Sequence, residues 1–539
     1  MSLFDSRSAG VSIPLTSLRS ERDWGVGDFA DISAFAAWMR SAGLRDLALL
    51  PLTECALGQE SPYAALSAFA LDPLLISLEG AEDFRAIGGI DALSSEQREE
   101  IEHLRAAPRV QHGPIRRLKM HALRKAHRHF SSLPGDDERH REFLTFRELH
   151  QAWLPDYALF RAIKERLHPE WWLAWPEPIR CREASALQEV RTALADDVSF
   201  FEYVQWQAFG QLERARTEAR HQGVRFLGDL PFVVAIDSAD AWSRQEEFST
   251  DETLGAPPDP YADEGQDWGL PSYRWERVRS SGWAWMKQRA REASRLYDAA
   301  RVDHVVGLYR SYVIPRDGAS PHFEPPDEET QRAQGEAILE ILREEARSVA
   351  DRILELREEG LALVAEDLGT VPPFVRESLG RLGIPGFRVL RWEKDGPTYR
   401  DPAGWPPLSV ATTGTHDTES LASWWDGLST EEKQAFRSIP SLAADWEGAP
   451  PFCEKVRNSI LELLYASPSR LLLLPVQDLF GFRDRINLPG TVGPENWAYR
   501  LPWTLEEMGR DPFVKKTADE LLARARRHGR CSEEGSTPI

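Results

Sequence analysis

The sequence predicts a (β/α)8 barrel, the TIM-barrel class, on three observations. Short runs rich in Leu and β-branched residues recur along the chain, stretches with helical periodicity separate them, and eight such runs can be placed. Strands that alternate with helices are typical of βα units around a parallel sheet, and eight units fit a closed barrel better than a doubly wound sheet. The predicted strands are residues 11–18, 46–52, 224–235, 299–308, 361–369, 387–392, 408–417 and 470–478.

The connection between the second and third predicted strands is far longer than an ordinary loop. It spans about 170 residues, so we expect it to hold an inserted subdomain together with the barrel helix that precedes the third strand. Residues 80–200 have a helical and charged pattern. The predicted division is a barrel formed by residues 1–79 and 201–539 and a mostly helical insertion formed by residues 80–200.

The clearest predicted helix covers residues 329–360 and ends at Gly360. Its apolar residues recur at near-helical spacing and predict a stripe that packs on the barrel: Ile338, Ile341, Leu342, Val349, Ile353 and Leu356. Two stretches rich in Pro and Gly, residues 255–269 and 400–407, are predicted to be long loops.

The charge of the chain argues against polyanionic partners. The 539 residues contain 65 Lys and Arg against 86 Asp and Glu, a formal net charge of −21 at pH 7. Phosphate backbones and anionic membrane surfaces would repel such a chain overall. We therefore expect neither nucleic acid nor a membrane as a partner.

The cysteines and the N-terminus indicate a cytoplasmic protein. The first residues, MSLFDSRSAGVSIPLTSL, lack the basic region and apolar stretch of a signal peptide, and no later run of about 18 apolar residues appears. The four cysteines form no CxxC pair, so neither a disulfide framework nor a zinc site is predicted. We expect a soluble, non-exported protein with reduced thiols at Cys55, Cys181, Cys453 and Cys531.

Tryptophan is abundant, with 19 residues, and many stand beside Gly, Pro or Asp in predicted loops. Flat aromatic faces in loops suit stacking on the apolar faces of pyranose rings. For any single tryptophan, a place in the core is the alternative. The residues in question are Trp24, Trp268, Trp275, Trp424 and Trp497.

In barrels of this class the chemistry lies at the C-terminal ends of the strands, and we interpret Asp303, Glu366 and Asp417 as acidic residues at such strand ends. Asp303 comes two residues after Arg301, and alternation along a strand points both side chains to the same side. A neighbouring guanidinium favours the ionised carboxylate that a nucleophile attacking an anomeric carbon needs. A structural ion pair is the alternative interpretation.

Glu366 follows an apolar run that predicts a buried strand. Desolvation raises the pKa of a carboxyl group, which lets it act first as the acid toward a glycosidic oxygen and then as a base. Asp367 could take this part instead, and a helix N-cap is the structural alternative. The sequence therefore predicts an acid/base at this strand end, with Glu366 as the first candidate.

Asp417 follows His416 within TTGTHDTES. A fixed carboxylate can hold substrate hydroxyls and a distorted sugar ring, while a neutral histidine donates a further hydrogen bond. Since SLASWW downstream predicts a helix start, a helix N-cap is the alternative here too. The segments between the three acidic residues can each hold one or more βα units, so all three can converge at one barrel mouth.

Longer motifs occur in a fixed order along the chain. They include SPYAALSAFALDPLLISLE, GDLPFVVAIDSADAW, GAPPDPYADEGQDWGLPSYRWE, RVDH, AEDLG, THD and PVQDLFGFRDRINLPGTVGPENWAYRL. Together they resemble the amylomaltases and disproportionating enzymes, glycoside hydrolase family 77, over nearly the whole chain. RVDH and AEDLG alone also resemble the broader α-amylase clan. GAPPD and INLPGTVG distinguish glycoside hydrolase family 77 from the rest of that clan.

The resemblance implies a 4-α-glucanotransferase that retains anomeric configuration and needs neither a metal nor an organic cofactor. Its donors and acceptors would be α-1,4-glucans such as maltooligosaccharides, starch and glycogen. It implies Asp303 as nucleophile, Glu366 as acid/base and Asp417 as the third catalytic residue. The implied substrate-binding residues are Tyr63 at the cleaved linkage, Asp229 on the donor side, Trp268 on the acceptor side, Arg301 beside the nucleophile, His304, His416 and Asn487, with Pro489, Gly490 and Trp497 at matching places.

The chain departs from the family pattern at two places. Leu270 follows the WG of the acceptor loop, where Asn is usual, and this removes an amide that could bind a sugar hydroxyl. Val305 and Val306 stand where Phe and Arg are common. Because Arg301, Asp303 and His304 are retained, we expect catalysis to survive.

Two other functions compete with transfer. An α-glucan hydrolase of the amylase type would use the same carboxylates with water as the acceptor, and a catalytically silent protein would only bind glucan. Products from maltotriose separate them, because transfer yields glucose and longer oligomers whereas hydrolysis yields no longer product. The presence of all three carboxylates argues against the silent protein.

Overall fold

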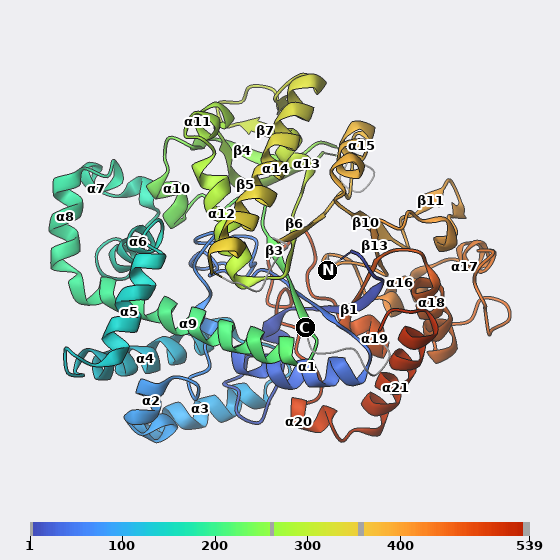
Figure 1. Cartoon of the computed structure of the whole chain (residues 1–539), viewed down its shortest axis with the longest axis horizontal. Coiled ribbons are helices and arrows are strands. Elements are labelled where there is room, and N and C mark those ends of the chain that lie inside the picture. The colour runs from blue at the N-terminus through green and yellow to red at the C-terminus, as the bar shows by residue number, and fades with distance from the viewer. Residues whose placement is uncertain (1–3, 259–263, 354–360, 532–539) are drawn as a thin grey trace.

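The computed structural model describes residues 4–258, 264–353 and 361–531. Within them, eight parallel strands close into a barrel in the order β1-β14-β13-β10-β9-β6-β3-β2, which confirms the predicted fold class. Each predicted strand contributes one barrel strand, and the barrel lies at the centre of the molecule in Figure 1. The strands are β1 (Ser8–Ile13), β2 (Asp46–Leu49), β3 (Arg225–Leu230), β6 (Ala299–Val302), β9 (Ala362–Ala365), β10 (Gly386–Val389), β13 (Ser409–Thr412) and β14 (Leu471–Pro475).

The predicted runs are longer than the strands because their ends leave the sheet. The run at 299–308, for example, ends in a turn and in helix α13 (Val306–Tyr309). The catalytic candidates therefore lie just beyond the strands rather than within them. The barrel interior is a compact apolar cluster of inward-facing residues, among them Ala48, Leu227, Val364, Phe387, Val389, Val410, Leu471 and Leu473.

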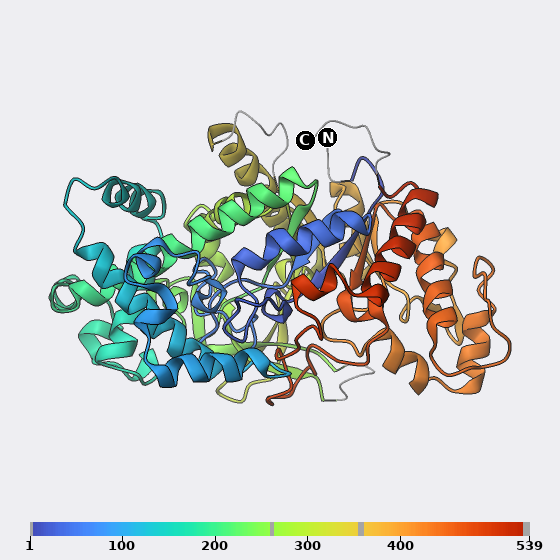
Figure 2. The ribbon, with the colours of Figure 1, turned by 90° about the horizontal axis from the view of Figure 1, so that it is seen from below.

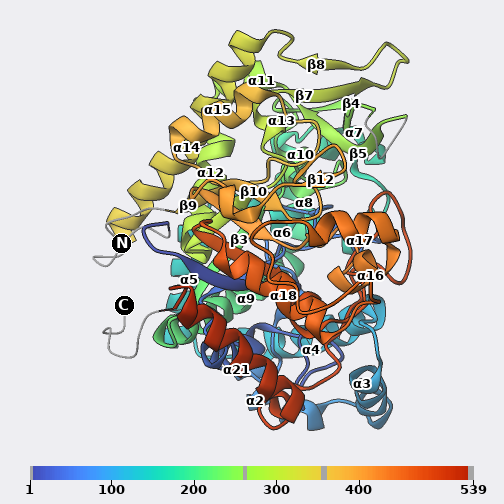
Figure 3. The ribbon, with the colours of Figure 1, turned by 90° about the vertical axis from the view of Figure 1, so that its right-hand side faces the viewer.

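Helices ring the barrel and bury its outer face. Neighbouring pairs such as α12 with α14, and α18 with α21, pack side by side (Figure 3). The longer helices of this ring are α1 (Ile32–Ser41), α9 (Ala195–His221), α12 (Ala284–Leu296), α14 (Glu328–Ile353), α15 (Pro373–Leu382), α18 (Glu454–Ala466) and α21 (Pro512–Arg527). Shorter helices follow strands or loops: α10 (Ala239–Ser243), α11 (Trp275–Ser280), α16 (Leu421–Gly427), α17 (Thr430–Arg437), α19 (Val476–Phe480) and α20 (Leu505–Met508).

Helix α14 matches the predicted helix 329–360 over its described part, and its Ile338 and Leu342 are buried. Leu356 and Gly360, named in that prediction, lie outside the described residues. None of the helices in the described segments combines the length and the apolar run that crossing a bilayer requires.

The connection between β2 and β3 is helical, as predicted. Figures 1 and 2 show its helices gathered at one side of the barrel. Helix α9 passes through residue 200 without a break, and the division of the chain at residues 79 and 200 stays a prediction. The helices are α2 (Glu82–Ala86), α3 (Ser95–Ala106), α4 (His112–Ser131), α5 (Glu138–Leu149), α6 (Leu154–Arg166), α7 (Glu177–Arg180), α8 (Ala184–Ala193) and the first part of α9.

The prediction of a long loop at 255–269 is wrong at both ends of that stretch. Its first residues belong to strand β4 and its last to strand β5, which pair in an antiparallel sheet of order β5-β4-β7-β8. At Gly255 a side chain would clash, because a Cβ atom would lie 2.0 Å from the Gln266 carbonyl oxygen. Residues 259–263 lie outside the described segments. The strands are β4 (Phe248–Ala256), β5 (Gln266–Tyr273), β7 (Ser311–Pro315) and β8 (His322–Glu324).

The second predicted loop, residues 400–407, holds only one short 3-10 turn, Pro402–Gly404. A small hairpin of β11 (Lys394–Asp395) and β12 (Thr398–Tyr399) precedes it.

Candidate active site

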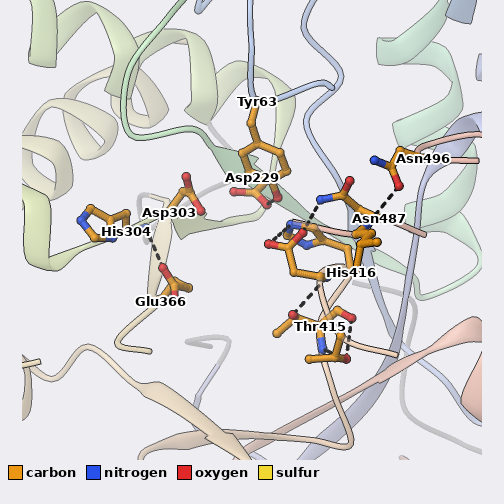
Figure 4. A network of polar contacts seen from close by, with 12 residues as sticks. Tyr63, Asp229, Asp303, His304, Glu366, Thr415, His416, Asn487 and Asn496 are labelled. Atoms are coloured by element: carbon orange, nitrogen blue, oxygen red, sulfur yellow. Dashed lines mark hydrogen bonds and ion pairs between the residues drawn. The ribbon is translucent and has the colours of Figure 1, made fainter. Parts of the chain in front are cut away.

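A cleft of about 480 Å³ lies at the carboxyl ends of the barrel strands. It brings together most of the residues that the sequence singled out, from segments far apart in the chain. Those that line it are Tyr63, Trp268, Arg301, Asp303, His304, Glu366, His416, Asp417 and Asn487, with Pro489, Gly490 and Trp497. Figure 4 shows Asp229 beside Tyr63, Asp303 next to it, and the Glu366 carboxylate bonded to the backbone of His304.

Arg301, at the end of β6, connects the acidic side chains. Its Nη1 atom donates to both oxygens of Asp229 at 2.8 and 2.7 Å, and its Nη2 atom lies 2.8 Å from Asp303 Oδ1. The same Nη2 atom is 4.0 Å from Glu366 Oε2. Burial alone would lower the pKa of Arg301, but the surrounding carboxylates, Asp229 foremost, raise it well above its ordinary value, so the guanidinium stays charged.

Asp303 is held from both sides. Arg301 contacts one carboxylate oxygen, and the backbone N–H of Phe232 donates to the other at 3.4 Å. The backbone N–H of Asp303 itself donates to the Leu230 carbonyl at 3.1 Å, which ties the residue to the end of β3. The ion pair proposed as the structural alternative therefore exists, but the carboxylate also faces the cleft.

Glu366 directly follows β9, and its backbone extends the hydrogen-bonded pairing of β9 with β6 by one residue. Its N–H donates to Val302 O at 3.0 Å, and its own carbonyl accepts from Val305 N at 3.2 Å. The carboxylate accepts from the backbone N–H groups of His304 at 2.8 Å and Leu368 at 3.2 Å. Burial raises the pKa of Glu366 to about 8; Arg301 opposes the rise and the negative charge of Asp303 adds to it.

Asp367, the alternative to Glu366, has other contacts. Its carboxylate accepts from Arg376 Nε at 3.1 Å and from the backbone N–H of Phe387 at 2.7 Å. It is buried and is absent from the lining of the cleft. A helix cap is also not the role of Glu366, because α15 begins at Pro373 with Pro372 as its N-cap. The geometry thus favours Glu366 as the group that faces a substrate.

Asp417 is fixed by two neighbours. Asn487 Nδ2 donates to Oδ1 at 2.6 Å, and His416 Nε2 lies 3.3 Å from Oδ2. Burial would raise the pKa of Asp417, but His416 and Asn487 outweigh it and lower the pKa to about 2. Asp417 does not cap α16, because the side chain of Ser420 accepts from the N–H of Ser423 there.

Aromatic rings form one wall of the cleft. Tyr63 stacks on His416 with ring centroids 4.9 Å apart and planes inclined by 17°, and Trp497 packs 5.5 Å from His416. The Tyr63 hydroxyl donates to Asp229 at 2.7 Å. Such a stack keeps the histidine ring in one orientation beside Asp417.

Asp229 lies beneath the cleft rather than in its lining. It is 5% exposed and contacts Arg301 and Tyr63. Burial raises its pKa, against the opposing effect of Arg301. This position favours holding Arg301 and Tyr63 in place over direct contact with a sugar.

Trp268 lies on β5, not in a loop as the sequence predicted. Its ring meets that of His304 edge to face, with centroids 4.8 Å apart. Leu270, two residues further along β5, also lines the cleft. The Gly307 backbone lies so close to His304 and Phe232 that a Cβ atom would come within 2.8 and 2.6 Å of their rings.

Other aromatic residues of the cleft were missed from the sequence. Tyr312 and Phe323 reach it from β7 and β8, with their rings 5.2 Å apart, and Trp392 follows β10 and is 41% exposed. The only signal for Trp392 was its position at the end of a predicted strand. Of the tryptophans singled out in the sequence, Trp24, Trp275 and Trp424 are core residues that do not line the cleft, whereas Trp497 is buried and also lines it.

Comparisons with known proteins identify the family of the chain. The family model described as 4-alpha-glucanotransferase, glycoside hydrolase family 77, matches residues 13–506. The 4-alpha-glucanotransferase of Chlamydia caviae is 32% identical over 527 residues, covering 95% of this chain and 94% of the relative. The 4-alpha-glucanotransferase of Thermus thermophilus is 33% identical over 508 residues, covering 92% of this chain and 95% of the relative.

Solved structures share the fold. The amylomaltase from Streptococcus agalactiae in complex with acarbose superposes with a TM-score of 0.80 at 24% identity, covering 98% of this chain and all of the other. The amylomaltase from Corynebacterium glutamicum gives a TM-score of 0.80 at 24% identity, covering 96% of this chain and 76% of the other. The chain therefore belongs to the 4-alpha-glucanotransferases, the retaining hexosyltransferases of glycoside hydrolase family 77.

Proposed function

We propose that this 4-alpha-glucanotransferase works by double displacement, with Asp303 as the nucleophile and Glu366 as the acid/base. A carboxylate oxygen of Asp303 forms a bond to the anomeric carbon while the glycosidic C–O bond breaks. Glu366 gives its proton to the departing oxygen, and the product is a covalent glucosyl ester. The observation that carries the proposal is the shared Arg301 Nη2 atom, 2.8 Å from Asp303 and 4.0 Å from Glu366.

In the second step the roles reverse. Glu366, now a carboxylate, takes the proton of an acceptor hydroxyl, whose oxygen attacks the anomeric carbon and releases Asp303. Two inversions give net retention. The pKa of about 8 for Glu366 suits a group that must be protonated in the first step and ionised in the second. Retaining enzymes require about 5 to 5.5 Å between the two carboxyl groups, and this separation stays a prediction here.

Asp417 binds hydroxyls of the sugar at the cleaved bond in this proposal. Its pKa of about 2 keeps it ionised, so it remains an acceptor throughout the cycle. His416 and Asn487 hold it, and Tyr63 stacks on His416 to fix that geometry. Hydrogen bonds from sugar hydroxyls to such a carboxylate strengthen as the ring distorts toward the transition state.

The acceptor enters beside Trp268 and His304. The apolar faces of a glucose ring can stack on this indole, and a bound acceptor excludes water from the glucosyl ester. We propose α-1,4-glucans as both donor and acceptor, namely maltooligosaccharides, starch and glycogen. A cytoplasmic location agrees with the four free thiols, which a reducing compartment would keep reduced.

Incubation of the pure protein with maltotriose tests the mechanism. Transfer gives glucose together with maltopentaose and longer oligomers, and the Asp303→Ala variant gives neither. Glucose and maltose without longer products would contradict transfer. Unchanged products from Asp303→Ala would contradict the assignment of the nucleophile.

A further inference from the structure

A second cavity, of about 490 Å³, is similar in size to the cleft. Its walls come mainly from α2, α5 and the second half of α9, which lie together on one side of the barrel (Figure 1), with Phe29, Ala30 and Gly80 completing them. Among the described residues, no side chain lines both cavities. We call it the α9 groove, defined by Glu82 and Arg85 of α2, Arg139 and Glu142 of α5, and residues 206–218 of α9.

The charged side chains of the α9 groove balance one another. Arg139 is already neutralised, because it contacts Asp83 at 2.6 Å and lies 3.8 Å from Glu82. Balanced charge gives no net attraction for an anion, and the chain as a whole carries −21. The groove therefore suits a neutral, hydroxyl-rich ligand. The charged residues are Arg85, Arg139, Arg214, Glu82, Glu142 and Glu218.

Trp206 supplies an aromatic surface in the groove. The residue is partly exposed, and its ring packs 5.3 Å from Phe130 and 5.7 Å from Phe143. The guanidinium of Arg139 lies 5.4 Å from the indole ring. A rigidly held indole beside planar polar groups can contact the apolar face of a pyranose while its neighbours bind the hydroxyls.

Gln207 provides an unused hydrogen-bonding group. The residue lines the groove and is 9% exposed, yet its amide has no hydrogen-bond partner among the described residues. In contrast, the side-chain amide of Gln211, one turn further along α9, has protein partners at both ends. Its oxygen accepts from Ser77 N at 2.7 Å, and its nitrogen donates to Ser77 O at 2.9 Å. An amide that offers both a donor and an acceptor matches two adjacent sugar hydroxyls.

Glycine keeps the groove open. A Cβ atom at Gly210 would meet only Arg214 Nη1, at 3.5 Å, so the space above this turn of α9 is empty of other protein atoms. Glycine costs a helix interior roughly 1 kcal/mol relative to alanine. A longer side chain at this position would fill the groove without removing any packing.

We propose that the α9 groove is a second binding site for α-glucan chains, separate from the catalytic cleft. A segment of a long polymer held there keeps the enzyme on starch or glycogen while other chain ends enter the cleft. A trisaccharide bound in the cleft would gain nothing from the groove. The inference rests on the chain's action on α-glucans, so its test treats the two sites separately.

The test compares a blocked groove with a matched control. Gly210→Leu fills the groove, and Gln207→Ala removes the unpaired amide while leaving Gly210 in place. Gly380→Leu is the control, because Gly380 is also within a helix, α15, with nothing within 4 Å of a Cβ atom and no part in either cavity. Each variant is measured by affinity electrophoresis in glycogen gels and by disproportionation of maltotriose.

We expect Gly210→Leu to weaken glycogen binding by about fivefold or more, the equivalent of one lost contact. Gln207→Ala should weaken it in the same direction, while KM and kcat for maltotriose stay at the values of the unaltered enzyme. The proposal is wrong if glycogen gels retard Gly210→Leu and Gln207→Ala as strongly as they retard Gly380→Leu. An equal loss on maltotriose and glycogen would also overturn it, because the groove would then act through the cleft. An unaltered enzyme that fails to disproportionate maltotriose contradicts the proposed function instead.

Discussion

The carboxylate of Glu366 accepts a hydrogen bond from the backbone N–H of His304 at 2.8 Å. His304 has a left-handed backbone, with φ of 44°, an uncommon conformation for a residue other than glycine. Strain of this kind persists where the surrounding fold imposes it, and it occurs often at active sites. The bond joins the segment after β6 to the segment after β9, so it links the chain next to the proposed nucleophile directly to the proposed acid/base.

The pH dependence of activity should follow Glu366. Its pKa of about 8 means that the protonated form, which the first step needs, is lost as the pH rises through 8. We expect kcat/KM for maltotriose to fall above pH 8, tenfold for each further unit. Initial rates between pH 5 and 10 check this, and a profile that stays flat to pH 10 would contradict it.

Ionisation of Glu366 should also lower the stability of the folded protein at high pH. The folded state raises the pKa of Glu366 above its ordinary value of 4.5, so the native protein binds this proton more tightly than the unfolded chain. Its stabilising effect is complete below pH 4.5 and is lost as the pH rises to 8. Glu366→Gln, which cannot ionise, should therefore gain in Tm relative to the unaltered protein, more at pH 9 than at pH 5. An equal offset at both pH values would disprove the argument.

Asp303→Asn should keep the shape of the site and remove its nucleophile. We expect kcat on maltotriose to fall at least about a thousandfold, the scale seen when a covalent nucleophile is lost. Product analysis by chromatography measures this, with circular dichroism as the check on folding. Residual activity within tenfold of the unaltered enzyme would point to another nucleophile.

Asn487 should influence the reaction rate by holding the carboxylate of Asp417. Its Nδ2 atom donates to the carboxylate at 2.6 Å, and hydrogen bonds to charged groups contribute about 1.5 to 3 kcal/mol. Asn487→Ala is expected to lower kcat about 10- to 100-fold. Asn496→Ala is the comparison, because Asn496 holds the same loop through Leu488 N at 3.0 Å without touching Asp417. A larger loss in Asn496→Ala would show that loop shape, rather than the contact with Asp417, decides the rate.

Leu270 should influence the acceptor. It lines the cleft on β5, two residues from Trp268, and carries no hydrogen-bonding group. Leu270→Asn adds an amide, and one neutral hydrogen bond contributes about 0.5 to 1.5 kcal/mol. We expect KM for a glucose acceptor to fall about two- to tenfold, measured at a fixed donor concentration. No change in KM with a lower kcat would show that the amide finds a protein partner instead.

The sequence by itself determined the barrel and the positions of its catalytic candidates. A parallel strand buried on both faces is a continuous apolar run, so β2, β9 and β14 stand out from the helices around them. Acidic residues at the C-terminal ends of such runs must lie at one end of the barrel. For this reason the amino-acid pattern alone predicts that Asp303, Glu366 and Asp417 share one barrel mouth.

Only the tertiary structure decided how those residues are paired and what completes the cleft. Arg301 lies between Asp229 and Asp303 because β3 and β6 are neighbours in the barrel, although Asp229 and Arg301 are 72 positions apart in the sequence. Trp268 lies on β5, whose register with β4 is irregular, and Phe323 lies on β8, a strand of three residues, so neither strand shows a regular alternating pattern in the sequence. Local patterns report which face of an element is buried, whereas long-range packing decides which elements meet.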